Sequence, residues 1–364
     1  MEDSAHEHQR FMKRAIALAG RGSGRVSPNP LVGAVVVRKG KVVGHGYHRY
    51  QGRDHAEVIA LERAGARAKG ANLYVSLEPC AHHGRTPPCV DRIIEAGISK
   101  VFVAVRDPSR HGPHKGISML RKKGIEVDLG LCSEPATRQN ETFLHFAGTR
   151  RPFVLLKLAL TLDGRIATGS GDSRWITQTG ARKQVHRLRY QYDAILVGIE
   201  TVLPDNPSLD VRWTRRNKIT KVILDSGLRT PARAELFVSS DRVIIFHGRR
   251  ADRKRVASLA KKAELVEVPG KDGLLDWEEI LERLGQLGVT SLIVEGGARV
   301  ATSILQARRV QKINFFYGPK IIGGGGRPGI GDLGIDRLKE AVQWDIHRIR
   351  HFPPDFMVEG YLRD

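Results

Sequence analysis

The sequence predicts two consecutive α/β domains, the first over residues 1–150 and the second over residues 151–364. A chain of 364 residues is long enough for two domains with complete cores. Short apolar runs alternate with helical patterns along both halves, as in sheets that carry helices on their faces. The junction Arg150-Arg151-Pro152 separates the two series.

In the first domain, glycines and prolines divide the alternating helix and strand patterns. Gly20, Gly70 and Gly97 each follow a helical stretch, and glycine is common where a helix ends. The Asn29-Pro30 pair precedes the first β-rich run. We therefore expect helices at residues 11–19, 57–68, 89–96 and 117–123, and strands at residues 31–37, 42–43, 72–77, 101–105 and 125–129.

In the second domain, a new apolar run follows the junction and breaks at Asp163-Gly164. Glu295-Gly296-Gly297 stands between an apolar strand pattern and a helix, where backbone amides can approach a phosphate, although a plain turn also explains a glycine pair. The glycine run at residues 323–326 is interpreted as a flexible connection or a bulge. Strands are expected at residues 153–160, 194–198, 221–224, 243–246, 265–268 and 291–295, and helices at residues 179–192, 277–284 and 298–305.

The net charge of +21 raises the question of a nucleic-acid partner. Residues 1–150 carry 24 Lys/Arg against 14 Asp/Glu, and residues 151–364 carry 36 against 25, so the excess is spread evenly. Aromatic residues make up only 6% of the chain, which leaves few platforms for stacking bases. We expect phosphorylated small molecules, and no nucleic acid, as partners.

The N-terminal residues contain no apolar core of a signal peptide. No stretch approaches the roughly 18 apolar residues that a membrane span requires. Three cysteines cannot form a disulfide framework, and a reducing compartment suits free thiols. The sequence therefore predicts a cytoplasmic protein that does not enter a membrane.

The residues that indicate chemistry most strongly are His55-Ala56-Glu57, Cys80 and Cys89. One histidine and two cysteines can bind Zn²⁺ and leave its fourth position open to water, as catalytic zinc sites do. A glutamate two residues after the histidine can transfer a proton without binding the metal. Zinc nucleobase deaminases use this set, although their usual C-x-x-C spacing is much shorter than the spacing here.

A simpler interpretation exists for each of these residues. Asp54 and Glu57 have the spacing of a helix capping box, so Glu57 could be a capping residue alone or a cap and a catalyst together. Cys80 and Cys89 could be buried thiols, which are common in cores. Because two of the three cysteines flank one loop and a His-x-Glu opens the preceding helix, zinc binding is the favoured interpretation.

The remaining candidates around the loop are His82, His83 and Cys132. Either histidine could compete as a zinc ligand, but His82 is preferred as a substrate contact and His83 as part of the loop structure. Cys132 stands apart and is expected to be a buried thiol. Cys89 is expected at a helix N-terminus, where the helix dipole favours a thiolate.

Further motifs extend along nearly the whole chain. They are Pro28-Asn29-Pro30-Leu31-Val32-Gly33, Gly46-Tyr47-His48, the continuous residues 77–89, Lys157, Leu162-Asp163-Gly164-Arg165, residues 173–177, Thr201, Asp205-Asn206-Pro207 and Glu295-Gly296-Gly297. With these residues the chain resembles the bacterial bifunctional deaminase-reductase family of riboflavin biosynthesis, from about residue 11 to about residue 360. The wide spacing between the cysteines is normal in that family.

The resemblance implies a cytidine-deaminase-like three-layer domain followed by an α/β domain similar to dihydrofolate reductase. The implied first reaction is the zinc-dependent deamination of 2,5-diamino-6-ribosylamino-4(3H)-pyrimidinone 5′-phosphate. The implied second reaction is the NADPH-dependent reduction of the ribosyl side chain, which gives 5-amino-6-ribitylamino-uracil 5′-phosphate. The family also implies one zinc ion per chain and a homodimer or homotetramer formed through the reductase domain.

In the deaminase domain, the resemblance implies that His55, Cys80 and Cys89 bind zinc and that Glu57 transfers the proton. The residues that would position the substrate are Asn29, His48, His82 and Arg85.

In the reductase domain, Asp205 and Lys157 are the ionisable candidates for catalysis, with Asp205 preferred as the proton donor. Lys157 could instead hold the substrate phosphate or Asp205. The implied substrate contacts are Ser173, Arg189, Leu209, Arg212 and Glu295. The implied cofactor contacts are Ala159, Trp175, Thr201, Asp205, Ser226, Gly297, Ala298, Arg299, Val300, Ala301, Thr302 and Ser303.

Two alternatives belong to other functional classes. A tRNA or polynucleotide deaminase with an appended binding domain would bind RNA in a salt-sensitive manner and would not consume NADPH. A chain in which one half is a degenerate binding module would be expected to lack the His-x-Glu motif or Asp205, and both are present.

Overall fold

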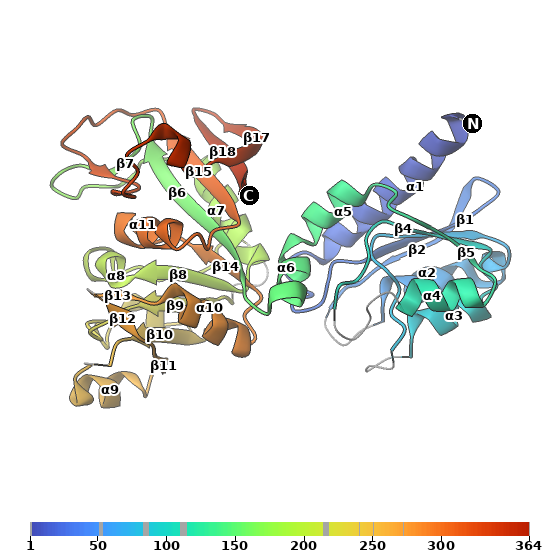
Figure 1. Ribbon diagram of the computed structural model, residues 1–364, viewed down its shortest axis with the longest axis horizontal. Helices are drawn as coiled ribbons and strands as arrows, with labels where there is room; N and C mark the ends of the chain where they lie inside the picture. Colours follow the sequence, from blue (N-terminus) through green and yellow to red (C-terminus); the bar gives the residue numbers. More distant parts are fainter. Residues whose placement is uncertain are drawn as a thin grey trace. The chain divides into compact units, whose positions relative to one another are not determined.

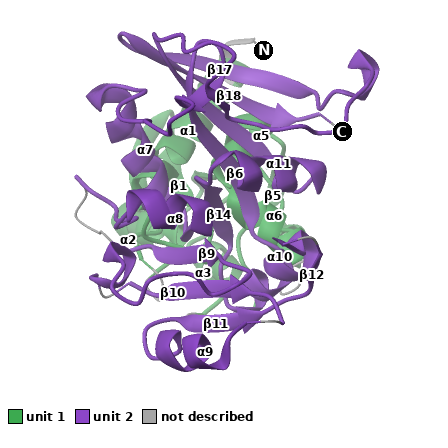
Figure 2. Ribbon diagram, turned by 90° about the vertical axis from the view of Figure 1, so that its left-hand side faces the viewer, with its two compact units in different colours: residues 1–150 green, residues 151–364 purple. Residues whose placement is uncertain are grey.

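The computed structural model describes residues 2–50, 54–82, 87–109, 115–213, 218–239, 241–249, 251–271 and 273–363. The chain forms two compact units, Met1–Arg150 and Arg151–Asp364 (Figures 1 and 2). Each unit has its own sheet and its own apolar clusters.

The first unit is built on a five-stranded sheet with the order β2-β1-β3-β4-β5. Strand β1 pairs antiparallel with β2 and β3, whereas β3, β4 and β5 are parallel. The strands are β1 (Gly33–Arg38), β2 (Lys41–Tyr47), β3 (Asn72–Val75), β4 (Lys100–Val103) and β5 (Glu126–Leu129).

Helices cover both faces of this sheet because alternate side chains of its strands point to opposite sides. In β1, Ala34 and Val36 join one apolar cluster, and Val35 and Val37 join the other. Figure 1 shows α2, α3 and α4 on one face and α1 and α5 on the other. The helices are α1 (Glu2–Ala19), α2 (Ala56–Ala64), α3 (Cys89–Glu95), α4 (Lys115–Lys122), α5 (Ser133–Gln139) and α6 (Glu141–Thr149).

The second unit contains a nine-stranded sheet with the order β11-β10-β9-β8-β14-β6-β15-β18-β17. The strands from β11 to β15 are parallel, and β18 and β17 add an antiparallel edge. The strands are β6 (Phe153–Thr161), β8 (Ala194–Gly198), β9 (Thr220–Leu224), β10 (Val243–His247), β11 (Glu264–Glu267), β14 (Ser291–Val294), β15 (Lys312–Gly318), β17 (Trp344–Phe352) and β18 (Asp355–Leu362). Short ladders join β7 (Arg165–Ala167) with β16 (Arg327–Pro328), and β12 (Gly270–Lys271) with β13 (Leu274–Leu275).

The helices of the second unit also lie on both faces of its sheet. Phe153 and Leu155 of β6 pack in the cluster that contains α7, while Val154 and Leu156 pack in the cluster that contains α10 and α11. The helices are α7 (Thr179–Gln191), α8 (Ile199–Asp205), α9 (Arg253–Leu259), α10 (Trp277–Gln286) and α11 (Ala298–Gln306). Single 3₁₀ turns occur in the chain at Gly20–Gly22, Gly65–Ala68, Glu235–Phe237 and Leu338–Glu340.

The α/β class expected from the sequence is confirmed, but several elements were not anticipated. The sequence pattern did not indicate α5, α6, β15, β17 or β18. Strand β17 is mostly exposed and mixes charged residues with isoleucines, so it shows no clear apolar alternation. The first helix begins at Glu2, well before the expected residue 11.

The glycine run at residues 323–326, expected as a flexible connection or a bulge, forms a turn closed by the hydrogen bond from the Gly326 N–H to the Gly323 carbonyl oxygen. The Asp163 carboxylate accepts hydrogen bonds from the backbone N–H groups of Ile322 and Gly323, the latter at 2.6 Å. Hydrogen bonds from Thr161 and from these amides lower the pKa of Asp163 to about 2. Gly323 has a φ of +88°, a region that favours glycine.

In the part of the chain that the structure describes, no helix is both long enough and apolar enough to cross a bilayer.

Candidate functional sites

The first unit brings His55, Cys80 and Cys89 together. His55 is the N-cap residue of α2, Cys89 is the first residue of α3, and Cys80 lies between β3 and α3. The Nδ1 atom of His55 lies 3.0 Å from Cys89 Sγ and 3.4 Å from Cys80 Sγ. All three ligand atoms lie within 4.8 Å of one another. Tetrahedral zinc would separate such ligand atoms by roughly 3.5–3.8 Å, so this donor set fits the metal.

A hydrogen bond links the side chains of Cys80 and Cys89. The hydrogen bond with Cys89 lowers the pKa of Cys80 to about 4, and the hydrogen bond with Cys80 together with burial raises the pKa of Cys89. Cys89 is the first residue of α3, as expected, and the stabilisation of its thiolate by the helix start stays a prediction. Ligation by both sulfurs would displace the proton of the hydrogen bond between them, since thiolates are the zinc-binding form.

Glu57 is the second residue of α2, and its side chain is buried beside these ligands. Burial raises the pKa of its carboxyl group, while the nearby His55 charge opposes this effect. The capping box expected from Asp54 and Glu57 is absent, because His55 is the N-cap residue and no side chain caps the helix. Glu57 is thus a buried carboxyl group close to the predicted metal ligands, a position suited to proton transfer.

His48 lies beside the predicted zinc ligand His55, and Asn29 lies beside His48. The Nδ1 atom of His48 lies 3.3 Å from the Asp54 carbonyl oxygen, to which it donates, and the Asn29 side-chain amide donates to Nε2 at 3.2 Å. The His48 ring meets the His55 ring edge-on, with 5.6 Å between their centres. Two predicted substrate contacts therefore lie next to a predicted zinc ligand.

The other predicted residues of this unit are less well defined. His82 is exposed and lies two residues after Cys80. Arg85 and His83 lie outside the described residues. Cys132 is half-buried rather than buried, and it precedes α5 in a left-handed conformation.

Glu78 is a buried residue at this site to which the sequence analysis gave no role. Its carboxylate accepts hydrogen bonds from the backbone N–H groups of Asp107 at 3.3 Å and Ile117 at 3.1 Å. At Gly116, a Cβ would lie 2.1 Å from the Pro79 carbonyl oxygen, so α4 approaches this segment closely. Glu78 therefore anchors the segment that carries Cys80. In the sequence, a charged residue at the end of an apolar strand pattern was the signal that could have indicated this role.

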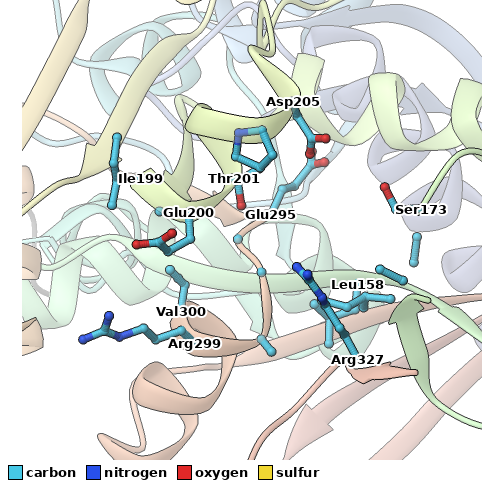
Figure 3. A pocket seen from close by; sticks show the side chains of 18 of the residues that line it. Leu158, Ser173, Ile199, Glu200, Thr201, Asp205, Glu295, Arg299, Val300 and Arg327 are labelled. Atoms are coloured by element: carbon cyan, nitrogen blue, oxygen red, sulfur yellow. The ribbon is translucent and has the colours of Figure 1, made fainter. Parts of the chain in front are cut away.

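The second unit contains a cavity of about 720 Å³ at the carboxyl ends of β8, β9 and β14. Ligands commonly bind at this edge of parallel sheets. The start of α11 also borders the cavity, with Gly297 as N-cap and no side-chain cap. Figure 3 shows Glu200 and Arg299 toward one end of the cavity and Asp205, Glu295 and Ser173 toward the other.

A buried ion cluster lies in this cavity. Arg189 forms two hydrogen bonds with Glu295, from Nε to Oε1 at 2.7 Å and from Nη2 to Oε2 at 3.0 Å. Lys157 Nζ donates to Glu295 Oε2 at 3.3 Å. Burial alone would raise the pKa of Glu295, but the charges of Arg189 and Lys157 lower it to about 2. Glu295 is therefore ionised at neutral pH.

Asp205 is the last residue of α8. Its side chain is 41% exposed and lies 3.8 Å from Arg174. Among the described residues, the partner of Lys157 is Glu295 rather than Asp205.

Most predicted reductase residues line the cavity, but Leu209, Arg212, Ala301 and Thr302 do not. Leu209 and Ala301 are buried in the apolar clusters. Thr302 Oγ1 donates to the Ala298 carbonyl oxygen and accepts from the Gly331 amide, so it joins two segments. The predicted residues that line the cavity are Lys157, Ala159, Ser173, Trp175, Arg189, Thr201, Asp205, Ser226, Glu295, Gly297, Ala298, Arg299, Val300 and Ser303.

Several charged or polar residues line the cavity without having been predicted. His186 is on α7, three positions before Arg189, and that spacing on a helix was an available signal. The others include Arg182, Glu200, Arg229 and Arg327.

Comparisons with known proteins cover both units. A family model described as the cytidine and deoxycytidylate deaminase zinc-binding region matches residues 5–105. A model described as the RibD C-terminal domain matches residues 152–358, more than half of the chain.

Curated relatives and solved structures match over nearly the full chain. The riboflavin biosynthesis protein RibD of Aquifex aeolicus is 42% identical over 349 residues, covering 96% of each chain. RibD of Escherichia coli is 40% identical over 357 residues, covering 95% of this chain and 96% of the relative. The crystal structure of a Thermotoga maritima diaminohydroxyphosphoribosylaminopyrimidine deaminase/5-amino-6-(5-phosphoribosylamino)uracil reductase has a TM-score of 0.88 and 38% identity, covering 99% of this chain and 100% of that chain.

Proposed function

Because this chain belongs to the RibD family of bifunctional deaminase-reductases of riboflavin biosynthesis, we propose a specific substrate and order of reactions for it. The first unit deaminates 2,5-diamino-6-ribosylamino-4(3H)-pyrimidinone 5′-phosphate. The second unit reduces the ribosyl group of the product with NADPH, which gives 5-amino-6-ribitylamino-uracil 5′-phosphate. The polynucleotide-deaminase alternative receives no support from the family matches, which include a reductase domain.

In the deaminase unit, His55, Cys80 and Cys89 hold zinc. When bound, the metal supplies the Lewis acidity that activates a water molecule for attack on the amine-bearing carbon. Glu57 accepts a proton from that water and delivers it to the departing ammonia. Asn29 and His48 position the pyrimidine ring, and the exposed His82, together with Arg85, contacts the ribose phosphate.

In the reductase unit, Glu295 orients Arg189 and Lys157 toward the substrate. When bound, NADPH supplies the hydride that reaches C1′ of the ribosyl group. The electron pair of the C1′–O4′ bond moves to O4′, and Asp205 donates a proton to that oxygen. Glu295 does not serve as this donor, because the charges of Arg189 and Lys157 lower its pKa to about 2 despite its burial.

The cofactor is assigned to the cavity edge at the start of α11. The backbone amides of an uncapped helix start suit an anionic phosphate. Gly297 has room for close approach, since the nearest atom to a Cβ built there is Thr201 Oγ1 at 3.7 Å. Gly296, in contrast, is required by packing, because its Cβ would lie 2.6 Å from Val300. The remaining proposed contacts are Ala159, Trp175, Thr201, Ser226, Arg299 and Ser303.

The observation that supports the deaminase assignment most strongly is the convergence of His55, Cys80 and Cys89 beside the buried Glu57. The experiment supplies the diamino-pyrimidinone phosphate to the wild type and to Glu57→Gln, with chromatography for the pyrimidines and absorbance for NADPH. The wild type is expected to deaminate the substrate and consume NADPH. The variant is expected to do neither until the deaminated compound is supplied, after which it consumes NADPH normally. A wild type that contains zinc and leaves the substrate unchanged would contradict the proposal.

We also propose a cytoplasmic location and a homodimer or homotetramer formed through the second unit. Cys80 and Cys89 must remain reduced to bind zinc, which suits the cytoplasm. Strand β17 is the edge of the large sheet and exposes Ile346 and Ile349. Light scattering that gives the mass of a single chain would contradict the oligomer.

A further inference from the structure

His186 lines the reductase cavity but has no role in the mechanism described above. It lies on α7 three positions before Arg189, so the two side chains share one face of the helix. Its ring is half-buried and meets the Trp213 ring edge-on, with 4.8 Å between the centres. The ring therefore packs against Trp213 and also lines the cavity.

One ring nitrogen of His186 already takes part in a hydrogen bond. The backbone N–H of Arg212 donates to Nδ1 at 3.0 Å. A backbone amide nitrogen can only donate, so Nδ1 must be the unprotonated nitrogen of a neutral ring. The proton of the neutral ring is therefore on Nε2. Among the residues that the structure describes, none accepts a hydrogen bond from that atom.

The surroundings also favour the neutral ring. Burial lowers the pKa of His186 to about 4; Arg189, Arg212 and Lys157 add to the shift, and Glu295 opposes it. Protonation of Nδ1 would in addition direct two N–H groups at each other. At neutral pH, His186 is thus an uncharged hydrogen-bond donor with a fixed orientation.

The charged residues near His186 indicate which kind of ligand group would bind its Nε2–H. Both oxygens of Glu295 already accept from Arg189, and one also accepts from Lys157. The charged groups that act on His186 are the cations Arg189, Arg212 and Lys157 and the carboxylate of Glu295, so the ring has positively charged surroundings. An anionic oxygen would be attracted here and could accept the hydrogen bond from Nε2.

We propose that His186 is a substrate-binding residue of the reductase site, donating its Nε2–H to a phosphate oxygen of the phosphorylated sugar. This inference rests on the proposed reductase function, because it takes that substrate as the ligand. A neutral donor adds directional recognition to the charges of the arginines.

The test compares His186→Asn with His186→Gln in the full-length protein. Asn retains a polar group near the Nδ1 position, whereas Gln can place an N–H near the Nε2 position. For Asn, the KM for the deaminated substrate should rise by about tenfold or more, the loss expected for a hydrogen bond to a charged group. Its kcat and its KM for NADPH should change by less than about twofold. Gln should restore most of the lost affinity.

A binding assay separates this inference from the proposed function. Ribose 5-phosphate and ribose are titrated into the wild type and both variants by calorimetry, without turnover. Asn should weaken the binding of ribose 5-phosphate by about tenfold and leave that of ribose unchanged. Equal binding of ribose 5-phosphate to all three proteins, or a loss that Gln does not restore, would overturn the role of His186. Intact His186-dependent binding in a wild type that does not reduce its substrate would contradict only the proposed function.

Discussion

The two units assemble their sites over very different distances along the chain. The proposed metal ligands of the first unit lie between His55 and Cys89, and two of them are at helix starts. The ion cluster of the second unit joins Lys157 and Glu295, which are 138 positions apart and meet through the parallel sheet. The first site is built from a short segment and is proposed to hold a metal, whereas the second depends on sheet topology. Loss of one residue should therefore have different consequences in the two units.

Cys89→Ser should remove the function of the first site and leave that of the second. Loss of one zinc ligand is expected to lower zinc content and to reduce deaminase kcat by at least about a thousandfold. Reduction of supplied deaminated substrate should continue at the wild-type rate. Metal analysis and separate assays of the two activities check this, with Cys132→Ser as the control that retains both. Normal zinc content in Cys89→Ser would refute the ligand assignment.

Glu295→Gln should damage the stability of the second unit as well as its activity. The side chains of Glu295, Arg189 and Lys157 are only 7%, 16% and 13% exposed, so two buried cations would lose their counter-charge. Removal of one partner from a buried pair costs about 3–5 kcal/mol of unfolding free energy. Urea denaturation measures this loss.

The matched control is Glu267→Gln, because Glu267 pairs with Arg249 where the two side chains are 55% and 80% exposed. A surface pair contributes about 0–1 kcal/mol. Equal losses in the two glutamate variants would contradict the buried-cluster interpretation.

His186 should make the second unit sensitive to mild acid. Burial, with Arg189, Arg212 and Lys157, holds the folded pKa at about 4, below the ordinary value of 6.5, although Glu295 opposes the shift. The unfolded chain therefore binds a proton first, and stability falls as the pH drops from 6.5 to 4. After allowance for solvent exposure the loss is about 1–2 kcal/mol. Urea denaturation at pH 7.5 and 4.5 should show a smaller loss for His186→Gln; identical losses would exclude this residue as the cause.

The smallest effect concerns the helix starts. Asp276 caps α10 by accepting from the amides of Glu278 and Glu279, so Asp276→Ala should cost about 1 kcal/mol of unfolding free energy. Asp54→Ala should cost less than about 0.3 kcal/mol, because no side chain caps α2. Thermal denaturation of both variants checks the comparison. A larger loss of unfolding free energy for Asp54→Ala would instead support the interpretation of Asp54 and Glu57 as a capping box.

The sequence indicated the residues that gather in the first unit because they lie close together along the chain. His55, Glu57, Cys80 and Cys89 are residue types with few ordinary roles in that combination, and the expected positions of His55 and Cys89 at two helix starts are confirmed. The capping box failed because Asp54-x-x-Glu57 has the right spacing but is displaced by one residue: the N-cap is His55. Spacing alone does not fix where a helix begins.

The second site was less accessible from the sequence because distant strands assemble it. Pairing of Glu295 with Arg189 and Lys157 requires the strand order of the sheet, which no local pattern encodes. The sequence around His186 gives no sign that its ring has a fixed orientation. The hydrogen bond that orients the ring comes from the Arg212 amide, 26 positions away. In β17, isoleucines between charged residues left no period that could be recognised.

We propose that each unit carries a complete site for one of two successive reactions. A mixture of Glu57→Gln and Glu295→Gln, supplied with the diamino-pyrimidinone phosphate and NADPH, tests this directly. Each variant alone should fail to make the ribityl product, with Glu295→Gln accumulating the deaminated compound. The mixture should make the ribityl product, because one variant deaminates and the other reduces. Accumulation of deaminated compound in the mixture, without the ribityl product, would contradict the claim.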